Sequence, residues 1–355
     1  MRDTVLVVRH GRGRGRIPKY GEHILEWLRA ERPDLAGRTL FHETGTGPVS
    51  LDEVCAVFFW LADPLQIKYP DCYEETIAIQ EEAERRSLPM INRPTALSTY
   101  GKSEQANRFT AANVPTPRAI RIESPSDLAG CIDRLGLPLL IRGGQSFSQE
   151  GTFIVRSRRD IESVKREQLP EQAIVTALMD VRGPRVGSRS GDLWTRYYHR
   201  KRVLLIGGQC APFSLFFART PVVDQGRSLY SEFHSWQTRL RRHGWLGKRA
   251  LRVLKRRLGV SRALELEREF AESPVDHEDV FRRAGVALGL EFLAFDFASL
   301  PSGKIVIWEA NPYPYIPPAS QTLLSHSRKR SESILSTYRA FAQCLESLLG
   351  SAADP

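Results

Sequence analysis

The sequence lacks the cysteine spacings that indicate a disulfide framework or a zinc site. Its 355 residues include five cysteines, and none forms a Cys-x-x-Cys pair or a His/Cys spacing of the kind zinc ligands need. We therefore expect small, reduced, buried cysteine side chains and a cytoplasmic protein. The five are Cys55, Cys72, Cys131, Cys210 and Cys344.

Long apolar runs are also missing. The longest N-terminal run, Val5 to Val8, is far shorter than the core of a signal peptide. No stretch approaches the roughly 20 apolar residues of a membrane span, so the sequence predicts no membrane partner. With 41% apolar and 26% charged residues, a chain of 355 residues is typical of a globular protein with two or three domains.

A dinucleotide-binding motif is absent after the first predicted strand, because Gly11, Gly13 and Gly15 are spaced by two and do not follow Gly-x-Gly-x-x-Gly. The stretch itself, VLVVRHGRGRGR at residues 5–16, has two other interpretations. Histidine phosphatases present their phospho-accepting histidine in an Arg-His-Gly triplet after a strand, and Gly/Arg tracts are typical of RNA-binding tails. A phosphatase also needs a second histidine, and a second Arg-His-Gly stands at residues 242–244, inside a basic, turn-like stretch.

The net charge of +10 is concentrated in one segment. Residues 239–257 contain nine Lys or Arg and no acid. From Leu246 onward the apolar residues recur at roughly helical spacing, which predicts a short amphipathic helix with a basic face. Such a helix is a solvated surface, a lid over a phosphate site, or a docking surface for an acidic peptide, a carrier or RNA. A basic nucleic-acid-binding protein therefore stays open as an alternative.

The first hundred residues predict a parallel sheet. Apolar runs at 5–8, 39–42 and 54–60 read as strands, and they alternate with amphipathic helices at 22–31 and 73–86. Further along the chain, longer strands with an antiparallel appearance are expected over 193–206 and 209–217. The fold class is therefore mixed, with an α/β domain first and α+β structure after it.

A hairpin near the C-terminus carries the most informative residues. Two apolar strands, 292–298 and 304–308, are joined by a turn that contains Pro301 and Gly303. The alternation of side chains along a strand predicts that Ile305, Ile307, Glu309 and Asn311 share one face. Across the hairpin, Asp296 interrupts an apolar strand, where an unpaired buried carboxylate would be costly.

Asp296, Glu309 and Asn311 supply three oxygen ligands at one end of that hairpin. Hard cations such as Mg²⁺ prefer carboxylate and amide oxygens, especially where phosphate oxygens complete the octahedron. The sequence therefore predicts a metal site there. The alternative for each residue alone is local capping or pairing with the backbone.

The order of strand with Asp, short turn, and apolar strand with Glu-x-Asn-Pro resembles the ATP-grasp superfamily. That superfamily includes D-alanine:D-alanine ligase, glutathione synthetase and the ribosomal-protein glutamate ligases. The resemblance implies a pre-ATP-grasp domain over 1–97, a small lid subdomain with the phosphate loop over 98–179, and a large subdomain over 180–350. The large subdomain would contain the metal site and a basic insertion at about 220–275. It also implies two Mg²⁺ ions, with Mn²⁺ as an alternative, held by Asp296, Glu309 and Asn311.

ATP contacts follow from the same resemblance. Lys102, in STYGKSEQANRF, matches a nucleotide-contacting Lys at a helix start, and Arg142, in LPLLIRGGQSFS, stands where relatives have Lys followed by Pro. Arg also holds phosphate, although the two side chains are not interchangeable. The stretch AIVTALMD at residues 173–180 resembles the hinge strand of the superfamily. This resemblance implies backbone contacts to adenine near Leu178 and a ribose contact from Asp180. The phosphate loop is expected to use Gly143, Gly144, Ser146 and Ser148.

The resemblance implies a carboxylate–amine ligase that forms an acyl phosphate from ATP and then an amide, on amino acids or peptides. A protein-, peptide- or tRNA-linked substrate is the alternative. Arg202 best matches an arginine that neutralises the transferring phosphate, with Arg196 and Arg219 as further candidates. In relatives the loop after the first strand faces the substrate cleft, so an anionic substrate would be bound by Arg9, His10, Arg12 and Arg14. Dimers are common in the superfamily, and the sequence leaves the oligomeric state open.

Overall fold

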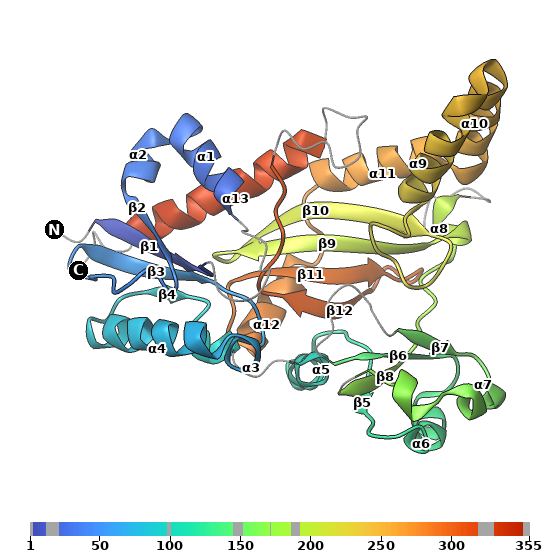
Figure 1. Cartoon of the computed structure of the whole chain (residues 1–355), viewed down its shortest axis with the longest axis horizontal. Helices are drawn as coiled ribbons and strands as arrows, with labels where there is room; N and C mark the ends of the chain where they lie inside the picture. The colour runs from blue at the N-terminus through green and yellow to red at the C-terminus, as the bar shows by residue number, and fades with distance from the viewer. Residues whose placement is uncertain are drawn as a thin grey trace.

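Three four-stranded sheets organise the chain (Figure 1). The N-terminal sheet has the strand order β2-β1-β3-β4, and it is followed by a small sheet of order β5-β8-β6-β7 and a large sheet of order β10-β9-β11-β12. This arrangement confirms the mixed fold class. The computed structural model describes residues 3–11, 21–97, 101–144, 152–170, 172–185, 192–318 and 330–350.

The N-terminal sheet is parallel, as the alternation of strands and helices predicts. Its central strand β3 is buried along its whole length, because helices cover both faces of a parallel sheet. The strands are β1 (Thr4–Arg9), β2 (Thr39–Glu43), β3 (Val54–Trp60) and β4 (Met90–Ile91). The helices are α1 (Glu22–Glu31), α2 (Pro33–Gly37), α3 (Leu65–Lys68), α4 (Pro70–Arg85) and η1 (Pro94–Leu97).

The small sheet is antiparallel. It has a core of its own, in which Leu128, Ile141 and Val175 are buried. Its strands are β5 (Ala119–Arg121), β6 (Leu139–Gly143), β7 (Phe153–Val155) and β8 (Ala173–Ala177). The helices of this part are α5 (Lys102–Ala111), α6 (Asp127–Leu135), α7 (Arg158–Ser163) and η2 (Arg166–Gln168).

The large sheet is also antiparallel, with β9 (Tyr198–Ile206), β10 (Gln209–Ala218), β11 (Phe292–Ser299) and β12 (Ile305–Asn311). The strand expected over 193–206 begins later than predicted. Its first residues form the short helix α8 (Leu193–Arg196), because the Asp192 side chain accepts a hydrogen bond from the Leu193 amide and so caps a helical turn. The remaining helices are α9 (Leu229–Leu240), η3 (Arg241–His243), α10 (Gly244–Leu258), α11 (Val260–Glu272), α12 (Glu278–Leu288) and α13 (Arg330–Gly350).

The N-terminal and large sheets share their cores, whereas the small sheet stands apart from both. Phe58 of β3 packs with Phe292 of β11 and with Phe341 of α13, at ring-centroid distances of 5.0 and 5.3 Å. Figure 1 shows α13 running along the N-terminal and large sheets, with the small sheet on the other side of β12. A cleft lies between the small sheet and the large sheet, and residues of both line it.

No helix of the described residues is long and apolar enough to cross a membrane. All five cysteines are free thiols, and Cys55, Cys131 and Cys344 are buried.

Candidate active site

Strand pairing brings one polar row together across the large sheet. Asp296 on β11 is paired on one side with Arg202 of β9 and on the other with Glu309 of β12. Ser214 of β10 is paired with Arg202 and ends the row. Directly paired residues of an antiparallel sheet point to the same face. Side chains from four strands therefore meet on one face of the sheet.

A β-bulge decides which side chains of the hairpin join this row. Between Asp296 and Phe297 the pairing shifts, so that Asp296 opposes Glu309 while Phe297 opposes Ile307, and Trp308 is the extra residue. The prediction that Ile305 and Ile307 share a face with Glu309 was therefore wrong. The isoleucines lie on the opposite face with Phe297, and the bulge turns Glu309 towards Asp296.

Asp296 is held by two arginines of β9. Arg202 donates from Nε to Oδ1 at 2.7 Å and from Nη2 to Oδ2 at 2.8 Å, and Arg200 donates from Nη1 to Oδ2 at 3.2 Å. Burial by itself would raise the pKa of this carboxyl, but the two arginines outweigh burial and lower the pKa of Asp296 to about 2. Asp296 is therefore an anion at any physiological pH.

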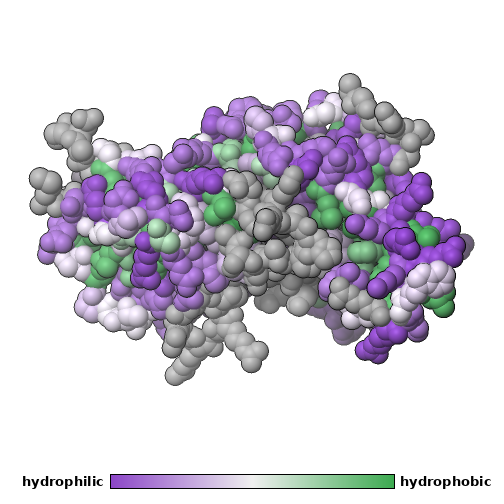
Figure 2. All heavy atoms as spheres, turned by 90° about the horizontal axis from the view of Figure 1, so that it is seen from above, coloured by the Kyte–Doolittle hydropathy of each residue, from purple (hydrophilic) through white to green (hydrophobic). Residues whose placement is uncertain are grey.

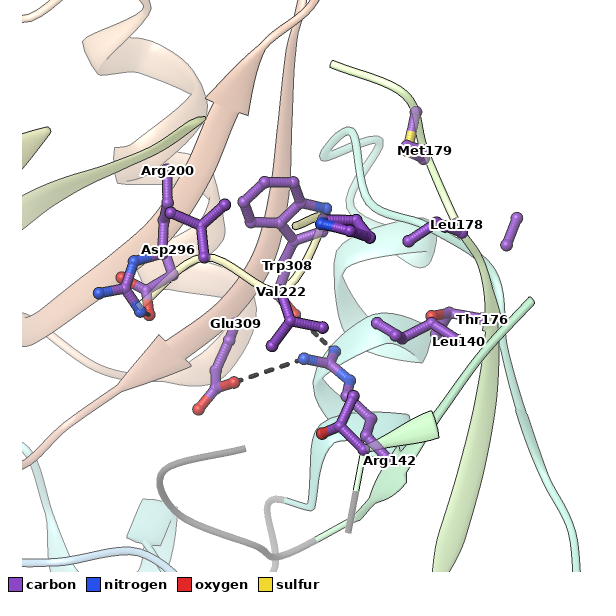
Figure 3. Close-up of a pocket in the computed structure, with 14 residues that line it drawn as sticks. Leu140, Arg142, Thr176, Leu178, Met179, Arg200, Val222, Asp296, Trp308 and Glu309 are labelled. Atoms are coloured by element: carbon purple, nitrogen blue, oxygen red, sulfur yellow. Dashed lines mark hydrogen bonds and ion pairs between the residues drawn. The ribbon is translucent and has the colours of Figure 1, made fainter. Parts of the chain in front are cut away.

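Glu309 faces two cations that come from the small sheet and from α5. Lys102 Nζ lies 3.7 Å and Arg142 Nη1 3.5 Å from its Oε2. Arg142 also donates from Nη2 to the Trp308 carbonyl at 3.1 Å, so it joins β6 to β12 across the cleft, as Figure 3 shows. Burial lowers the pKa of Lys102 and that of Arg142, and Glu309 opposes both shifts.

Beside these charges the cleft is apolar. Leu140 of β6 lines it together with Leu178 and Met179, which follow β8, and Trp308 of β12 lines it together with Val222, which follows β10. Figure 3 shows this slot continuing into the charged end at Arg142, Glu309 and Asp296. A flat heterocycle fits between such apolar walls, while the charged end suits its anionic substituents.

The charged end carries more positive than negative charge. Among the described residues four part-buried cations face two carboxylates, and such an excess of positive charge is costly unless an anion joins it. Arg142 Nε, Arg200 Nε and Thr152 Oγ1 are buried without a hydrogen-bond partner among the described residues. The cleft is therefore complementary to a polyanion such as a nucleotide polyphosphate. The six charged residues are Lys102, Arg142, Arg200, Arg202, Asp296 and Glu309.

Solved structures share the overall fold of this chain. The ATP-grasp ligase PsnB complexed with a minimal precursor matches with a TM-score of 0.54 and 13% identity, over 94% of this chain and 99% of that one. PsnB with minimal precursor, Mg and ADP matches with a TM-score of 0.54 and 14% identity, over 94% and 98%. The chain has the ATP-grasp fold.

A third structure with this fold is the macrocyclase MdnC from Microcystis aeruginosa MRC, bound with precursor peptide MdnA. It matches with a TM-score of 0.50 and 12% identity, over 94% of this chain and 99% of that one. No family model and no curated protein matches the sequence. The ATP-grasp fold is thus shown by the structure and is not visible in overall sequence identity.

The donor set of this ATP-grasp cleft suits a divalent cation only when a phosphate accompanies it. Among the described residues, no group of three or more His, Cys, Asp or Glu side chains is placed to hold a metal ion. Asp296 and Glu309 supply two carboxylates, and the side-chain oxygen of Asn311 accepts the Tyr313 amide at 2.9 Å. The surrounding cations oppose a bare metal ion. Phosphate oxygens would offset that charge and complete the oxygen ligands that Mg²⁺ prefers.

Arg200 is a site residue that the sequence reasoning missed. It lies two positions before Arg202 on β9, so alternation along the strand puts both on one face. That spacing was the available signal. The predicted residues Arg196 and Arg219 lie elsewhere, since Arg196 donates to the Arg257 carbonyl and Arg219 pairs with Glu232.

The residues predicted to contact adenine and ribose, Leu178 and Asp180, already have partners elsewhere in the chain. The Leu178 amide is already bonded to the Pro138 carbonyl at 2.9 Å, so that N–H is not available to a base. Asp180 is half exposed, forms an ion pair with Arg182, and does not line the cleft.

The predicted phosphate loop is only partly described. The Gly144 carbonyl accepts the Lys102 amide at 3.0 Å, and a Cβ at Gly144 would lie 2.6 Å from the Gln172 carbonyl oxygen. Only glycine fits that approach. Gly143 precedes it at the end of β6, with its carbonyl 3.5 Å from Lys102 Nζ. Ser146 and Ser148 lie outside the described residues, as do Arg12 and Arg14.

The loop after β1 begins with an enclosed histidine. His10 Nε2 accepts the Ala62 amide at 2.8 Å, and its ring centroid lies 4.8 Å from that of Tyr69 and 5.3 Å from that of Tyr313. Burial lowers the pKa of His10 to about 4, so the ring is neutral. The preceding Arg9 pairs with Glu43 at 2.7 Å.

This packing does not suit the histidine-phosphatase alternative, in which the phospho-accepting histidine must present a ring nitrogen to substrate. The second Arg-His-Gly, at residues 242–244, lies in η3 and at the start of α10. Figure 1 shows that segment at the opposite end of the molecule from β1. The two triplets therefore cannot form one site.

The basic segment folds as predicted, into an amphipathic helix. α10 packs against α9, and an open groove between them is lined by Trp236, Leu246, Arg249, Val253 and Arg257, among others. Trp236, Leu246 and Val253 are 41%, 66% and 52% exposed. Large apolar side chains gathered at this exposure mark interaction surfaces.

Proposed function

We propose that the chain is an ATP-dependent ligase that activates a carboxylate as an acyl phosphate and joins it to an amine, with release of ADP. The observation that carries the proposal is the excess of cations beside an apolar slot, between the two sheets that hold the cleft of the ATP-grasp fold. In the reaction a carboxylate oxygen attacks the γ-phosphorus of ATP and ADP leaves. The amine nitrogen then attacks the acyl carbon, and phosphate leaves as the amide forms.

The side chains divide into groups by their positions. The slot formed by Leu140, Met179 and Trp308 would hold the adenine, and Lys102, Arg142 and Arg200 would hold the phosphates. Arg202 would fix the orientation of Asp296. Asp296, Glu309 and Asn311 would hold Mg²⁺, which supplies charge neutralisation for phosphoryl transfer. Fixed cations in a cleft sheltered from water stabilise the charge that develops on the transferring group.

The cleft must open for the nucleotide to enter. It encloses about 80 Å³, whereas small-molecule sites hold on the order of 300–1,000 Å³. Arg142 closes it by contacting Trp308 and Glu309 across the two sheets. We infer that Arg142 exchanges its contacts with Trp308 and Glu309 for the phosphates of a bound nucleotide, which would leave Glu309 available to hold Mg²⁺.

ADP release tests the proposed reaction. Purified chain is screened with pairs of amino acids and short peptides, and mass spectrometry identifies the amide product. ADP formation is expected to require both a carboxylate and an amine, and to be lost in Glu309→Gln. Glu232→Gln, which alters a surface ion pair with Arg219, is the matched control. Full activity in a folded Glu309→Gln protein would refute the assignment.

We further propose that the substrate is a peptide held at the groove between α9 and α10. PsnB and MdnC, with which the chain shares its fold, were determined with precursor peptides. The groove combines exposed apolar side chains with Arg249 and Arg257. Figure 2 shows hydrophilic side chains over most of this end of the molecule, with small apolar patches among them. An acidic peptide with spaced apolar residues matches both features.

Charge reversal tests this docking surface. A fluorescent acidic peptide with apolar residues at helical spacing is expected to bind wild type, and to bind at least tenfold more weakly in an Arg249→Glu, Arg257→Glu double variant. Arg283→Glu, on α12 and away from the groove, serves as the control. Equal binding by the double variant would remove the groove from the proposal. Preferential binding of an RNA oligonucleotide, with steep salt dependence, would favour the nucleic-acid alternative.

A further inference from the structure

A second cavity lies on the other face of the large sheet. It has a volume of about 320 Å³, which is within the range of small-molecule sites. One row of paired residues forms its floor, with Leu215 of β10 beside Lys201 of β9, and Lys201 beside Phe297 of β11. This row is one residue away from the row that holds Arg202 and Asp296. Alternation therefore directs it to the face opposite the nucleotide cleft.

The walls of this back cavity come from three segments that are distant in sequence. Trp194 of α8 and Phe270 of α11 stand on two sides, and the loop before α12 contributes Val275. Figure 1 shows α11 lying over the large sheet on the side away from the small sheet. About half of the lining side chains are apolar, and the charged ones include two cations.

Lys201 is the first of these cations. Its Nζ donates to Ser299 Oγ at 3.0 Å, and lies 5.7, 5.3 and 6.0 Å from the ring centroids of Trp194, Phe270 and Phe297. No carboxylate of the described residues lies within ion-pair distance of Nζ. An ammonium group has three donors, and one of them is used. Aromatic faces stabilise a cation but do not replace a counter-ion.

Arg185 is the second cation, and it converges on the same residue. It donates from Nη2 to the Ser299 carbonyl at 2.7 Å, and its guanidinium stacks at 4.2 Å on the ring of Trp194. Both cations therefore bond to Ser299, Arg185 through its carbonyl and Lys201 through its hydroxyl, and all three residues line the cavity. Anion sites in proteins are built from hydrogen-bond donors that converge on one space and are held in place by packing.

Acidic groups also line this cavity, and Asp192, just before α8, acts on Arg185. Glu269 of α11 pairs with Arg262, and Asp276 stands in the loop before α12. The other titratable groups around Lys201 are Arg185, His277 and, beside it on β9, the buried His199. Burial, with Arg185 nearby, lowers the pKa of Lys201 to about 8. Asp276 opposes that shift without removing it.

We propose that the back cavity binds a small carboxylate with an apolar body, whose acid group pairs with Lys201 and Arg185 and whose body packs among Trp194, Phe270 and Phe297. One lysine, one arginine and one hydroxyl match a singly charged carboxylate better than a phosphate dianion, which needs more donors. The site is separate from the nucleotide cleft, and its existence does not depend on the proposed ligase activity.

Phenylacetate is a suitable probe, with phenylacetamide as its neutral control. Isothermal titration of the full chain is expected to show saturable, one-site binding of phenylacetate and none of the amide. Lys201→Met removes the charge while it keeps an unbranched side chain that fits an aromatic site. It is expected to weaken binding at least tenfold. Arg142→Ala, which removes a cation from the nucleotide cleft, is expected to leave phenylacetate binding unchanged.

The dependence on pH provides a second test that does not need Lys201→Met to fold. The ammonium of Lys201 is present below pH 8 and is lost above it, so phenylacetate affinity is expected to fall roughly tenfold for each pH unit above 8. Lys201→Arg keeps its charge and is expected to bind with no such decrease.

Three results would overturn the proposal. They are the absence of saturable phenylacetate binding, equal binding of the amide, and wild-type affinity in Lys201→Met. Tighter binding of phenyl phosphate than of phenylacetate would overturn the choice of acid group. Loss of phenylacetate binding in Arg142→Ala would assign it to the nucleotide cleft instead.

Discussion

Asp296→Asn isolates the electrostatic centre of the cleft. The carboxylate is part-buried between Arg200 and Arg202, whose side chains are 12% and 20% exposed, and its removal takes this anion away from both. The lowering of its pKa from 3.8 to about 2 corresponds to about 2 kcal/mol of folding free energy. Breaking a buried ion pair from one side typically costs about 3–5 kcal/mol. We therefore expect Asp296→Asn to lose about 2–5 kcal/mol of stability at pH 7.

Urea unfolding followed by circular dichroism measures this loss. The folded-state pKa of Asp296 is below its unfolded value, so the advantage of wild type is complete above about pH 4 and is lost as pH falls towards 2. At pH 3, about half of the stabilisation that comes from the lowered pKa of Asp296 remains. Asp180→Asn removes an exposed partner of Arg182, and is expected to cost less than about 1 kcal/mol at either pH. Equal stability of wild type and Asp296→Asn at pH 7, or a difference that does not shrink at pH 3, would refute the reasoning.

Two further predictions concern the N-terminal domain. Gly11→Ala is expected to cost about 1–3 kcal/mol, because its Cβ would overlap the Thr44 carbonyl oxygen, whereas Gly37→Ala, whose Cβ meets nothing within 4 Å, serves as the control in thermal unfolding. Stability of Gly11→Ala equal to that of the control would contradict the close approach. Replacing Arg12 and Arg14 with Ala is expected to raise KM for the acid substrate and to leave nucleotide affinity unchanged. An unchanged KM would remove Arg12 and Arg14 from the proposed substrate site.

Periodicity was sufficient to predict several of the strands. Buried runs such as 54–60 and the hairpin around Pro301 and Gly303 appear as strands, because alternation and turn residues act locally. The same reasoning failed at 193–206, where the side chain of Asp192 caps a helical turn that the apolar pattern does not reveal.

The candidate site was harder to predict, because it depends on pairing between strands. Asp296 and Glu309 were correctly expected to lie close together, but the bulge at Trp308 reversed the face expected for the isoleucines. Alternation along β9 could have placed Arg200 on the face of Arg202, but the contact of both with Asp296, and the back cavity at Lys201, depend on the register of β9 with β11. No local pattern in the sequence specifies that register.

Nucleotide affinity tests the central claim most directly. Calorimetric titration with Mg-ADP compares wild type with Arg142→Ala, which removes a buried contact across the cleft, and with Arg219→Ala, which removes a surface arginine. A charged hydrogen bond is worth about 1.5–3 kcal/mol, so Arg142→Ala is expected to bind at least roughly tenfold more weakly. Arg219→Ala is expected to bind as wild type does. Saturable binding of Mg-ADP with equal affinity in all three proteins, or no binding by wild type, would contradict the assignment of this cleft as the nucleotide site.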